Sequence, residues 1–172
     1  DDLEVDVRHD ATQREQIDLV DVVDTHDAVR VAQAEVADGA QRGWIVPIGG
    51  AENKDNSPQI LRRFVGLAGG EAARIVVVPT ASQLRDTGPR YERLFRELGA
   101  GQATALDFDT RRDAEEPGRM EVLQAATGVF FTGGNQLRIS TIMGGTSAAK
   151  MIRTGNARGV HVAGTSAGAS IL

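Results

Sequence analysis

Short apolar runs alternate with longer amphipathic segments over residues 44–172. Each run is short, and most are followed at once by Gly or Pro, which is typical of buried strands joined by tight turns. The clearest is Arg74–Val78, whose unbroken β-branched run suits a strand that is covered on both faces. We predict strands at 44–48, 74–78, 104–108, 128–131 and 159–163.

The segments between these runs carry apolar residues at helical spacing. The first helix is expected to have Ser57 as its N-cap and Pro58 in its first position, and to stop at Gly69-Gly70. Further helices are predicted at 89–98, 120–126, 136–143 and 147–153, and residues 169–172 could open another. Because strands and helices alternate with short connections, the pattern predicts a doubly wound α/β domain with a largely parallel sheet.

Composition fits one globular domain, or part of a larger one, in a chain of 172 residues. Only seven residues are aromatic, so the core is expected to be built from Val, Ile, Leu and Ala. Cysteine is absent, which excludes disulfides, cysteine-ligated zinc and a cysteine nucleophile. No apolar run approaches the roughly 20 residues of a membrane span, and the basic residues are too dispersed to indicate nucleic-acid binding.

Residues 1–42 differ in charge from the rest of the chain. They hold 12 acidic residues and four arginines, a net charge of −8, against +3 for residues 43–172. We therefore expect an acidic N-terminal extension at 1–42, solvated and partly disordered, ahead of a domain at 43–172. The alternative is a remnant of an upstream element, because the extension also contains apolar residues such as Ile17, Leu19 and Val20.

The strongest motif is Gly164-Thr165-Ser166-Ala167-Gly168, which matches the G-x-S-x-G nucleophile elbow and follows an apolar strand. A sharp turn of this kind pushes the serine hydroxyl out of the sheet. The N–H of Ala167 would then point to where an oxyanion forms. Ser166 is therefore the candidate nucleophile, and the alternative is a glycine-rich turn with a capping serine.

Two further turns end predicted strands. In Gly133-Gly134-Asn135-Gln136, tandem glycines allow close approach of backbone N–H groups, so Gly134 is the candidate second oxyanion donor. Asn135 and Gln136 are candidate substrate-binding residues, unless they only cap the next helix. The turn at 49–54 either lines the same site or is a polar loop that enters the first helix. All three turns follow strand ends, where α/β sheets bind ligands.

A serine nucleophile needs a general base, usually a histidine that a carboxylate orients. His9 and His26 lie in the acidic extension, and His161 lies in the strand that leads to Ser166. We expect the His161 side chain to point into the sheet packing and to be structural. Because only six residues follow Ser166, the simplest inference is that the base and the acid are missing from this chain and that the sheet is incomplete at its C-terminus.

Four segments in residues 43–172 together resemble the cyanophycinases, members of the serine peptidase family that also contains dipeptidase E. They are GGAENK at 49–54, RIVVVPTAS at 74–82, FFTGGNQLRIS at 130–140 and GTSAGASIL at 164–172. The resemblance implies a flavodoxin-like fold of the class I glutamine amidotransferase type, with Ser in place of the Cys nucleophile. It also implies hydrolysis of peptide bonds that follow aspartate. Cyanophycinases cut cyanophycin, a polyaspartate backbone that bears arginine on its side-chain carboxyls, into β-aspartyl-arginine dipeptides.

The resemblance assigns roles to single residues. Ser166 matches the nucleophile, Gly134 and Ala167 match the oxyanion hole, and Gln136 matches a glutamine that lines the substrate site. It further implies no metal or cofactor, a peptide polymer as substrate, and a homodimer when the protein is full length. Asn53 departs from the family's usual acidic residue. The family's histidine, acid and arginines lie beyond residue 172, so residues 1–172 alone are expected to be nearly inactive.

Three other interpretations stay open at this point. The first is an α-aspartyl dipeptidase of the same family. Comparing hydrolysis of β-aspartyl-arginine material with hydrolysis of Asp-Leu would distinguish it from a cyanophycinase. The second is a non-catalytic binding protein with the amidotransferase-like fold, and the third is a plain flavodoxin-like ligand binder, for which labelling of Ser166 would fail. An enzyme that degrades an intracellular storage polymer is expected in the cytoplasm, with a secreted form as the alternative.

Overall fold

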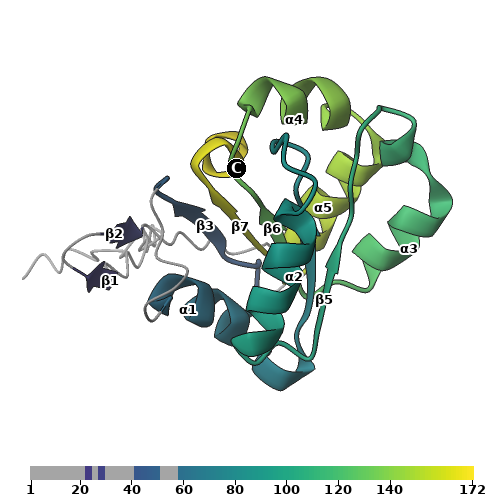
Figure 1. The fold of residues 1–172 in the computed structure, drawn as a ribbon. Helices are drawn as coiled ribbons and strands as arrows, with labels where there is room; N and C mark the ends of the chain where they lie inside the picture. The colour runs from purple at the N-terminus through teal and green to yellow at the C-terminus, as the bar shows by residue number, and fades with distance from the viewer. Residues whose placement is uncertain (1–21, 25–26, 30–40, 51–57) are drawn as a thin grey trace, which may run out of the picture.

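The computed structural model describes residues 22–24, 27–29, 41–50 and 58–172. Its centre is a parallel sheet with the strand order β3-β7-β6-β4-β5 (Figure 1). These strands are β3 (Ile45–Ile48), β4 (Arg74–Val78), β5 (Gln102–Ala105), β6 (Gly128–Phe131) and β7 (His161–Thr165). A separate antiparallel pair consists of β1 (Val22–Asp24) and β2 (Asp27–Val29).

Helices cover both faces of this sheet. Residues of α1 (Gln59–Leu67) and α2 (Thr87–Glu97) pack in one hydrophobic core. Residues of α3 (Pro117–Gln124), α4 (Gln136–Met143) and α5 (Ser147–Ala157) pack in the other. Short 3₁₀ helices complete the connections: η1 (Gly70–Ala72), η2 (Asp113–Glu115) and η3 (Ser166–Ile171). The predicted doubly wound α/β fold with a parallel sheet is confirmed.

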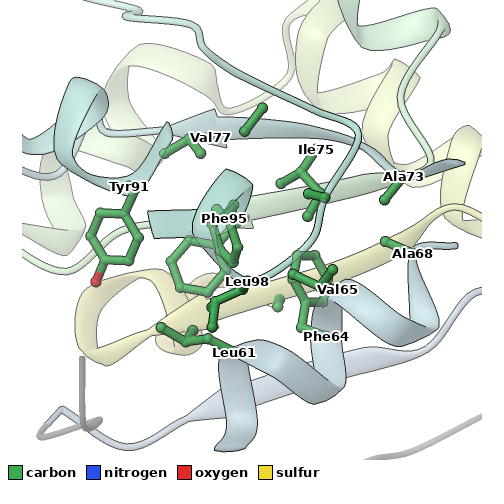
Figure 2. Packing of buried hydrophobic residues seen from close by; sticks show 14 of the residues in the cluster. Leu61, Phe64, Val65, Ala68, Ala73, Ile75, Val77, Tyr91, Phe95 and Leu98 are labelled. Carbon is green, nitrogen blue, oxygen red and sulfur yellow. The ribbon is translucent and has the colours of Figure 1, made fainter. Parts of the chain in front are cut away.

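Alternate residues of each strand supply the two cores, because successive side chains of a strand point to opposite faces. In β4, Ile75 and Val77 pack with α1 and α2, whereas Val76 and Val78 pack on the opposite face. Four of the seven aromatic residues meet on the first face, with ring centroids 5.0–6.0 Å apart: Phe64, Tyr91, Phe95 and Phe130. Figure 2 shows Tyr91 and Phe95 of α2 above Phe64 of α1. The expectation of a purely aliphatic core is therefore incomplete.

Several predicted boundaries are wrong. The strand predicted at 159–163 spans His161–Thr165, and the helix predicted at 120–126 spans Pro117–Gln124. The strand expected at 104–108 begins and ends earlier, because Gln102–Ala105 pair in register with Arg74–Val77 of β4. Phe108 instead lies buried in the following loop, where the Arg119 guanidinium stands 5.6 Å from its ring centroid. Helix α1 begins at Gln59, so Pro58 precedes the helix and does not occupy its first position. Ser57 lies outside the described residues, as do 51–54 and most of 1–42.

The strand order creates a switch point in the sheet. From β4 the chain passes through α2 to β5 on one side, and from β6 it passes through α4 and α5 to β7 on the other side (Figure 1). The two connections use opposite faces, so the loops after β4 and β6 diverge at the carboxyl ends of adjacent strands. Open α/β sheets bind ligands at such a point. Within the described ranges, no helix has the length and apolarity needed to cross a membrane.

Candidate active site

Ser166 follows β7 directly and begins η3. Its φ is 51°, and among the described residues it is the one non-glycine residue with a positive φ. Such a conformation costs on the order of 1–3 kcal/mol and persists only where the surrounding structure imposes it. The residue is nevertheless exposed, at the carboxyl end of a strand that is otherwise almost entirely buried. The sharp, strained turn predicted from the G-x-S-x-G motif is confirmed.

The two glycines of the motif are required by close backbone packing. A Cβ atom on Gly164 would overlap the carbonyl oxygen of Gly168. A Cβ atom on Gly168 would overlap the carbonyl oxygen of Phe131, the last residue of β6. Because both obstacles are backbone atoms, they cannot move aside as a flexible side chain would. The turn at Ser166 is therefore held between its own strand and the neighbouring one.

Two glycine-rich turns lie against Ser166. A Cβ on Gly50 would stand 3.4 Å from the Ser166 Oγ, and a Cβ on Gly133 would stand 3.4 Å from the Ser166 Cβ. Gly50 follows β3 and Gly133 follows β6, the two strands that flank β7. The Thr165 hydroxyl also donates a hydrogen bond to the Gly49 carbonyl at 3.3 Å. The structure thus brings the turns after β3, β6 and β7 to one place, and the absence of side chains leaves the serine accessible.

Gly134 sits on the loop that follows β4. Its φ is 142°, and a Cβ there would overlap the carbonyl oxygen of Ala81. The next N–H, of Asn135, donates to that same carbonyl at 2.8 Å. The turn at Pro79–Ser82, to which the sequence analysis gave no role, therefore supports the second glycine-rich turn. Two signals pointed to it: its position directly after a buried strand, and its place in the segment 74–82 that carries the family resemblance.

Asn135 and Gln136 begin helix α4. The Asn135 Oδ1 accepts a hydrogen bond from the Leu137 N–H at 2.9 Å, so Asn135 is the N-cap of α4 and the capping interpretation is confirmed for that oxygen. Gln136 is the first helical residue, and it is exposed. Both residues follow directly after Gly134, at the edge of the sheet that carries Ser166.

His161 lies at the opposite end of β7 from Ser166. Its Nδ1 accepts a hydrogen bond from the Trp44 N–H at 3.0 Å, and partial burial lowers its pKa below the ordinary value. Five residues separate it from Ser166 along an extended strand, about 16 Å at about 3.3 Å per residue. The expected structural role of His161 is confirmed. His9 and His26 lie outside the described residues.

Charged side chains also lie at this edge of the sheet. In the described ranges no three Asp, Glu or His side chains stand close enough together to hold a metal ion. Four charged residues line a pocket at the ends of β4 and β5: Arg85 of the loop after β4, Asp107 and Asp109 after β5, and Arg138 of α4. The arrangement offers a strained, exposed hydroxyl beside two glycine-rich turns, which suits nucleophilic attack on a carbonyl when a base is supplied.

Comparison with known proteins gives related sequences and folds. The profile of Peptidase family S51 matches residues 45–172. Cyanophycinase from Trichormus variabilis is 40% identical over 136 residues, which is 77% of this chain and 45% of that protein. Cyanophycinase from Geminocystis herdmanii is 38% identical over 133 residues, 76% of this chain and 49% of that protein. The chain thus spans about half the length of the curated relatives it matches.

Two solved structures share the fold. A peptidase from an acI-B1 Actinobacterium superposes with a TM-score of 0.55 at 22% identity, covering 69% of this chain and 53% of its own. A putative peptidase E protein from Listeria monocytogenes superposes with a TM-score of 0.50 at 25% identity, covering 63% and 54%. The α/β fold with a parallel sheet is therefore that of peptidase E structures, a fold of the class I glutamine amidotransferase type.

Proposed function

Because the chain belongs to peptidase family S51, we propose that it carries the nucleophile of a cyanophycinase-type serine peptidase. The proposed substrate is cyanophycin and the products are β-aspartyl-arginine dipeptides. The main support is Ser166, strained and exposed between glycine-rich turns, in a chain 40% identical to a cyanophycinase over 77% of its length. We further propose, on the resemblance alone, a homodimer that acts in the cytoplasm without a metal or cofactor.

In the proposed mechanism the Ser166 Oγ attacks an aspartyl carbonyl carbon of the polyaspartate backbone. The dipeptide products keep the bond between aspartate side chain and arginine, so the bond that breaks is a backbone peptide bond. A general base takes the hydroxyl proton and gives it to the leaving amine, and water then hydrolyses the acyl-enzyme. The N–H groups of Gly134 and Ala167 stabilise the oxyanion.

Gln136 and Asn135 are proposed to position the substrate. Gln136 is exposed at the first turn of α4, next to the glycine-rich turn, so its amide is available to a polar group of the polymer. Asn135 uses its Oδ1 to cap α4, which leaves its NH₂ group for a substrate carbonyl or carboxylate.

The base and the acid are proposed to lie outside residues 1–172. His161 supports the proposal because it is held by Trp44 at the far end of β7. The matched residues make up only 45% and 49% of the two cyanophycinases, which leaves room for both groups in the rest of such a protein. An α-aspartyl dipeptidase is the second candidate, favoured by the likeness in fold to the putative peptidase E protein from Listeria monocytogenes.

The test is to treat the full-length gene product with a fluorophosphonate and to assay it on cyanophycin and on Asp-Leu. We expect label on Ser166 and release of β-aspartyl-arginine. Ser166→Ala should lose both, whereas Ser147→Ala, a matched change at an exposed serine that begins α5, should keep both. Hydrolysis of Asp-Leu alone would favour the dipeptidase. A full-length protein that neither labels nor hydrolyses would overturn the enzymatic proposal in favour of a binding protein.

A further inference from the structure

A polar cleft of about 330 Å³ lies at the carboxyl ends of β4 and β5. One wall is the loop after β4, another is the loop after β5, and Arg138 of α4 closes a third side. The cleft adjoins the candidate active site, since Thr80 and Ser82 line it while Ala81 between them supports Gly134. Nothing in the mechanism proposed above uses this cleft.

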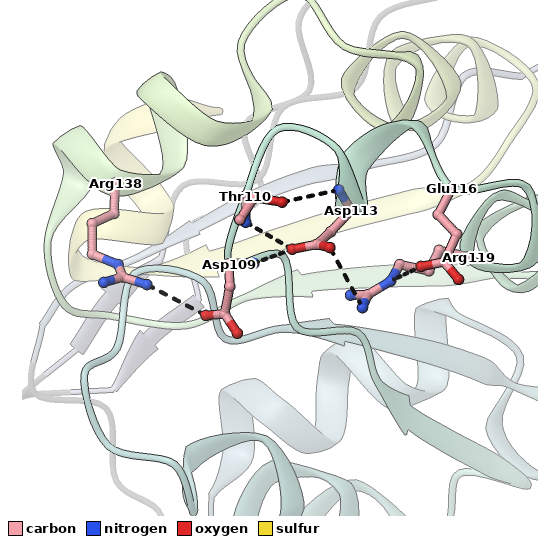
Figure 3. A network of polar contacts seen from close by, with 6 residues as sticks. All are labelled: Asp109, Thr110, Asp113, Glu116, Arg119 and Arg138. Atoms are coloured by element: carbon pink, nitrogen blue, oxygen red, sulfur yellow. Dashed lines mark hydrogen bonds and ion pairs between the residues drawn. The ribbon is translucent and has the colours of Figure 1, made fainter.

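Four charged side chains line the cleft, and two of them, Arg138 and Asp109, form an ion pair. The Arg138 Nε donates to the Thr80 carbonyl at 3.0 Å, and its guanidinium stands 3.6 Å from the Asp109 carboxylate. Figure 3 shows this ion pair, which joins α4 to the loop after β5. The pair is solvent-exposed and contributes little stability, but it places one positive charge beside one negative charge.

The other two charged groups have no such partner. Within the described residues, no hydrogen bond or ion pair joins Arg85 or Asp107 to another side chain. Partial burial is the main cause that raises the pKa of Asp107. The negative charges of Asp109 and Glu92 also raise this pKa, and the positive charge of Arg119 lowers it. The cleft therefore offers one carboxylate and one guanidinium, each free to bind a group of opposite charge.

A third group in the wall also lacks a partner. Thr80 is 4% exposed, and its Oγ1 is buried without a hydrogen bond. Buried hydroxyls in folded proteins are almost always hydrogen-bonded, so this one needs an ordered water, or a shift of the cleft wall when a ligand binds, to be satisfied.

We propose that this cleft is a subsite for the polymer, in which Asp107 binds the guanidinium and Arg85 the free α-carboxylate of an arginyl branch next to the unit being cleaved. The proposal rests on the proposed function. Arginine attached through its α-amino group keeps one cation and one anion, the complement of what the cleft leaves unpaired. Strand β5 lies three strand spacings from β7, about 14 Å at about 4.8 Å each. That distance places the cleft beyond the attacked unit and within reach of a neighbouring one.

The first experiment measures hydrolysis of cyanophycin by the full-length protein. Asp107→Asn and Arg85→Gln should each raise KM about tenfold, the usual effect of losing a hydrogen bond to a charged group, while kcat stays within twofold. Glu97→Gln and Arg93→Gln are matched controls, because they make the same charge changes at exposed positions of α2. If Asp107→Asn and Arg85→Gln behave like these controls while the protein hydrolyses cyanophycin, the subsite is overturned and the proposed function stands.

The second experiment measures binding without turnover. In a Ser166→Ala background, calorimetric titration compares a two-unit cyanophycin fragment with its citrulline analogue, which lacks the guanidinium charge. We expect about tenfold tighter binding of the arginine form, and Asp107→Asn should abolish this preference. That outcome would support the subsite even if no hydrolysis were found, in which case only the catalytic proposal fails. If the Ser166→Ala protein with Asp107 intact binds the arginine fragment and the citrulline fragment equally, the proposed subsite is overturned.

Discussion

At the scale of single residues, the conformation of Ser166 depends on glycines that no other residue could replace. Gly164 and Gly168 each face a backbone carbonyl where a Cβ would be, and Gly50 and Gly133 leave space beside the serine Oγ and Cβ. The exposure of the hydroxyl is thus a property of its neighbours, because each of them lacks a side chain that would cover it.

The first prediction concerns Gly168→Ala. The added methyl would meet the Phe131 carbonyl, and overpacking of this kind costs about 1–3 kcal/mol. Denaturant titration should show the free energy of unfolding lowered by about that amount, and the full-length protein should lose fluorophosphonate label on Ser166. The control is Gly66→Ala in α1, where a Cβ meets nothing and alanine favours the helix by about 1 kcal/mol. Equal effects of the two changes would contradict the packing argument.

The second prediction concerns His161 and pH. Its Nδ1 must be unprotonated to accept from Trp44, and burial lowers its pKa. In the unfolded chain histidine takes up a proton near pH 6.5, so the stability due to neutral His161 is complete above that pH. It is lost as the pH falls through 6.5 toward the lower pKa of the folded state.

His161→Asn keeps an acceptor at this position but does not titrate. Chemical denaturation at pH 7, 6 and 5 should therefore show a smaller loss of stability for the variant than for the parent protein. Labelling of Ser166 in the full-length protein should be unchanged, because His161 lies at the other end of β7. Loss of label in the variant would assign His161 a catalytic part and refute the structural role.

At the scale of elements, the side chains of a strand pack into the hydrophobic cores on both faces of the sheet. How completely a strand is buried on both faces influences how well its limits can be predicted from the local sequence. β4 and β6 are buried on both faces, and their predicted limits agree with the structure residue for residue. β5 is an edge strand, and its predicted limits are wrong, because its register follows from pairing with β4. An apolar residue such as Phe108 can be buried in a loop, so local hydrophobicity does not locate the end of an edge strand.

The third prediction concerns the aromatic cluster between α1, α2 and the sheet. Phe95 is fully buried and contacts the rings of Phe64, Tyr91 and Phe130. Phe95→Ala should lower the free energy of unfolding by about 3–5 kcal/mol, the cost of a cavity in a packed core. Leu84→Ala is the control, since Leu84 is 71% exposed and a change there should stay within about 0.5 kcal/mol. Similar losses in both variants would show that the cluster does not hold α2 on the sheet.

The fourth prediction concerns the loop after β5, which carries Asp107 and Asp109. The Asp113 Oδ2 accepts from the N–H groups of Thr110 at 2.7 Å and Asp109 at 3.0 Å (Figure 3). The hydrogen bond from the Thr110 N–H is the main reason that the pKa of Asp113 lies below its ordinary value. The stability from this carboxylate is present above its unfolded pKa, near 4, and is lost as the pH falls through the lower folded pKa.

Asp113→Asn should consequently reduce thermal stability at pH 7 and reduce it less at pH 3, which lies below the ordinary pKa of an aspartate in the unfolded chain. Differential scanning calorimetry at both pH values would measure this. The matched change Asp86→Asn, at an exposed aspartate without a side-chain cap hydrogen bond, should have a smaller effect at pH 7. Equal effects at both pH values would indicate that Asp113 does not organise this loop through its charge.

At the scale of the whole molecule, the candidate nucleophile and the polar cleft both lie at the carboxyl edge of the sheet, where the connections after β4 and β6 run to opposite faces. The turns after β3, β6 and β7 surround Ser166, and the cleft after β4 and β5 continues the same edge. The histidine that the described residues contain is at the opposite edge. A peptidase built on this arrangement needs a base from elsewhere, and the matched residues of the two cyanophycinases, 45% and 49% of their lengths, are consistent with that proposal.

The fifth prediction compares residues 1–172 with the full-length gene product. The shorter protein should hydrolyse cyanophycin with kcat reduced on the order of 10⁶-fold, which is the effect of removing the base from a serine triad. A single-turnover assay with purified polymer would measure this, and circular dichroism would check that both proteins are folded. Hydrolysis at an undiminished rate by residues 1–172 would place the base within them.

Features that depend on neighbours along the chain could be predicted from the order of amino acids alone. The alternation of strands and helices follows from the local hydrophobic period, and the turn at Ser166 follows from glycines two residues away on either side. Which of these local features lie together depends on how the chain folds. Gly134 rests on Ala81, the aromatic rings converge from three elements, and Asp107 shares a cleft with Arg85 and Arg138. The reason is that strand order and register are set by packing between segments far apart in the chain, and no local pattern carries that information.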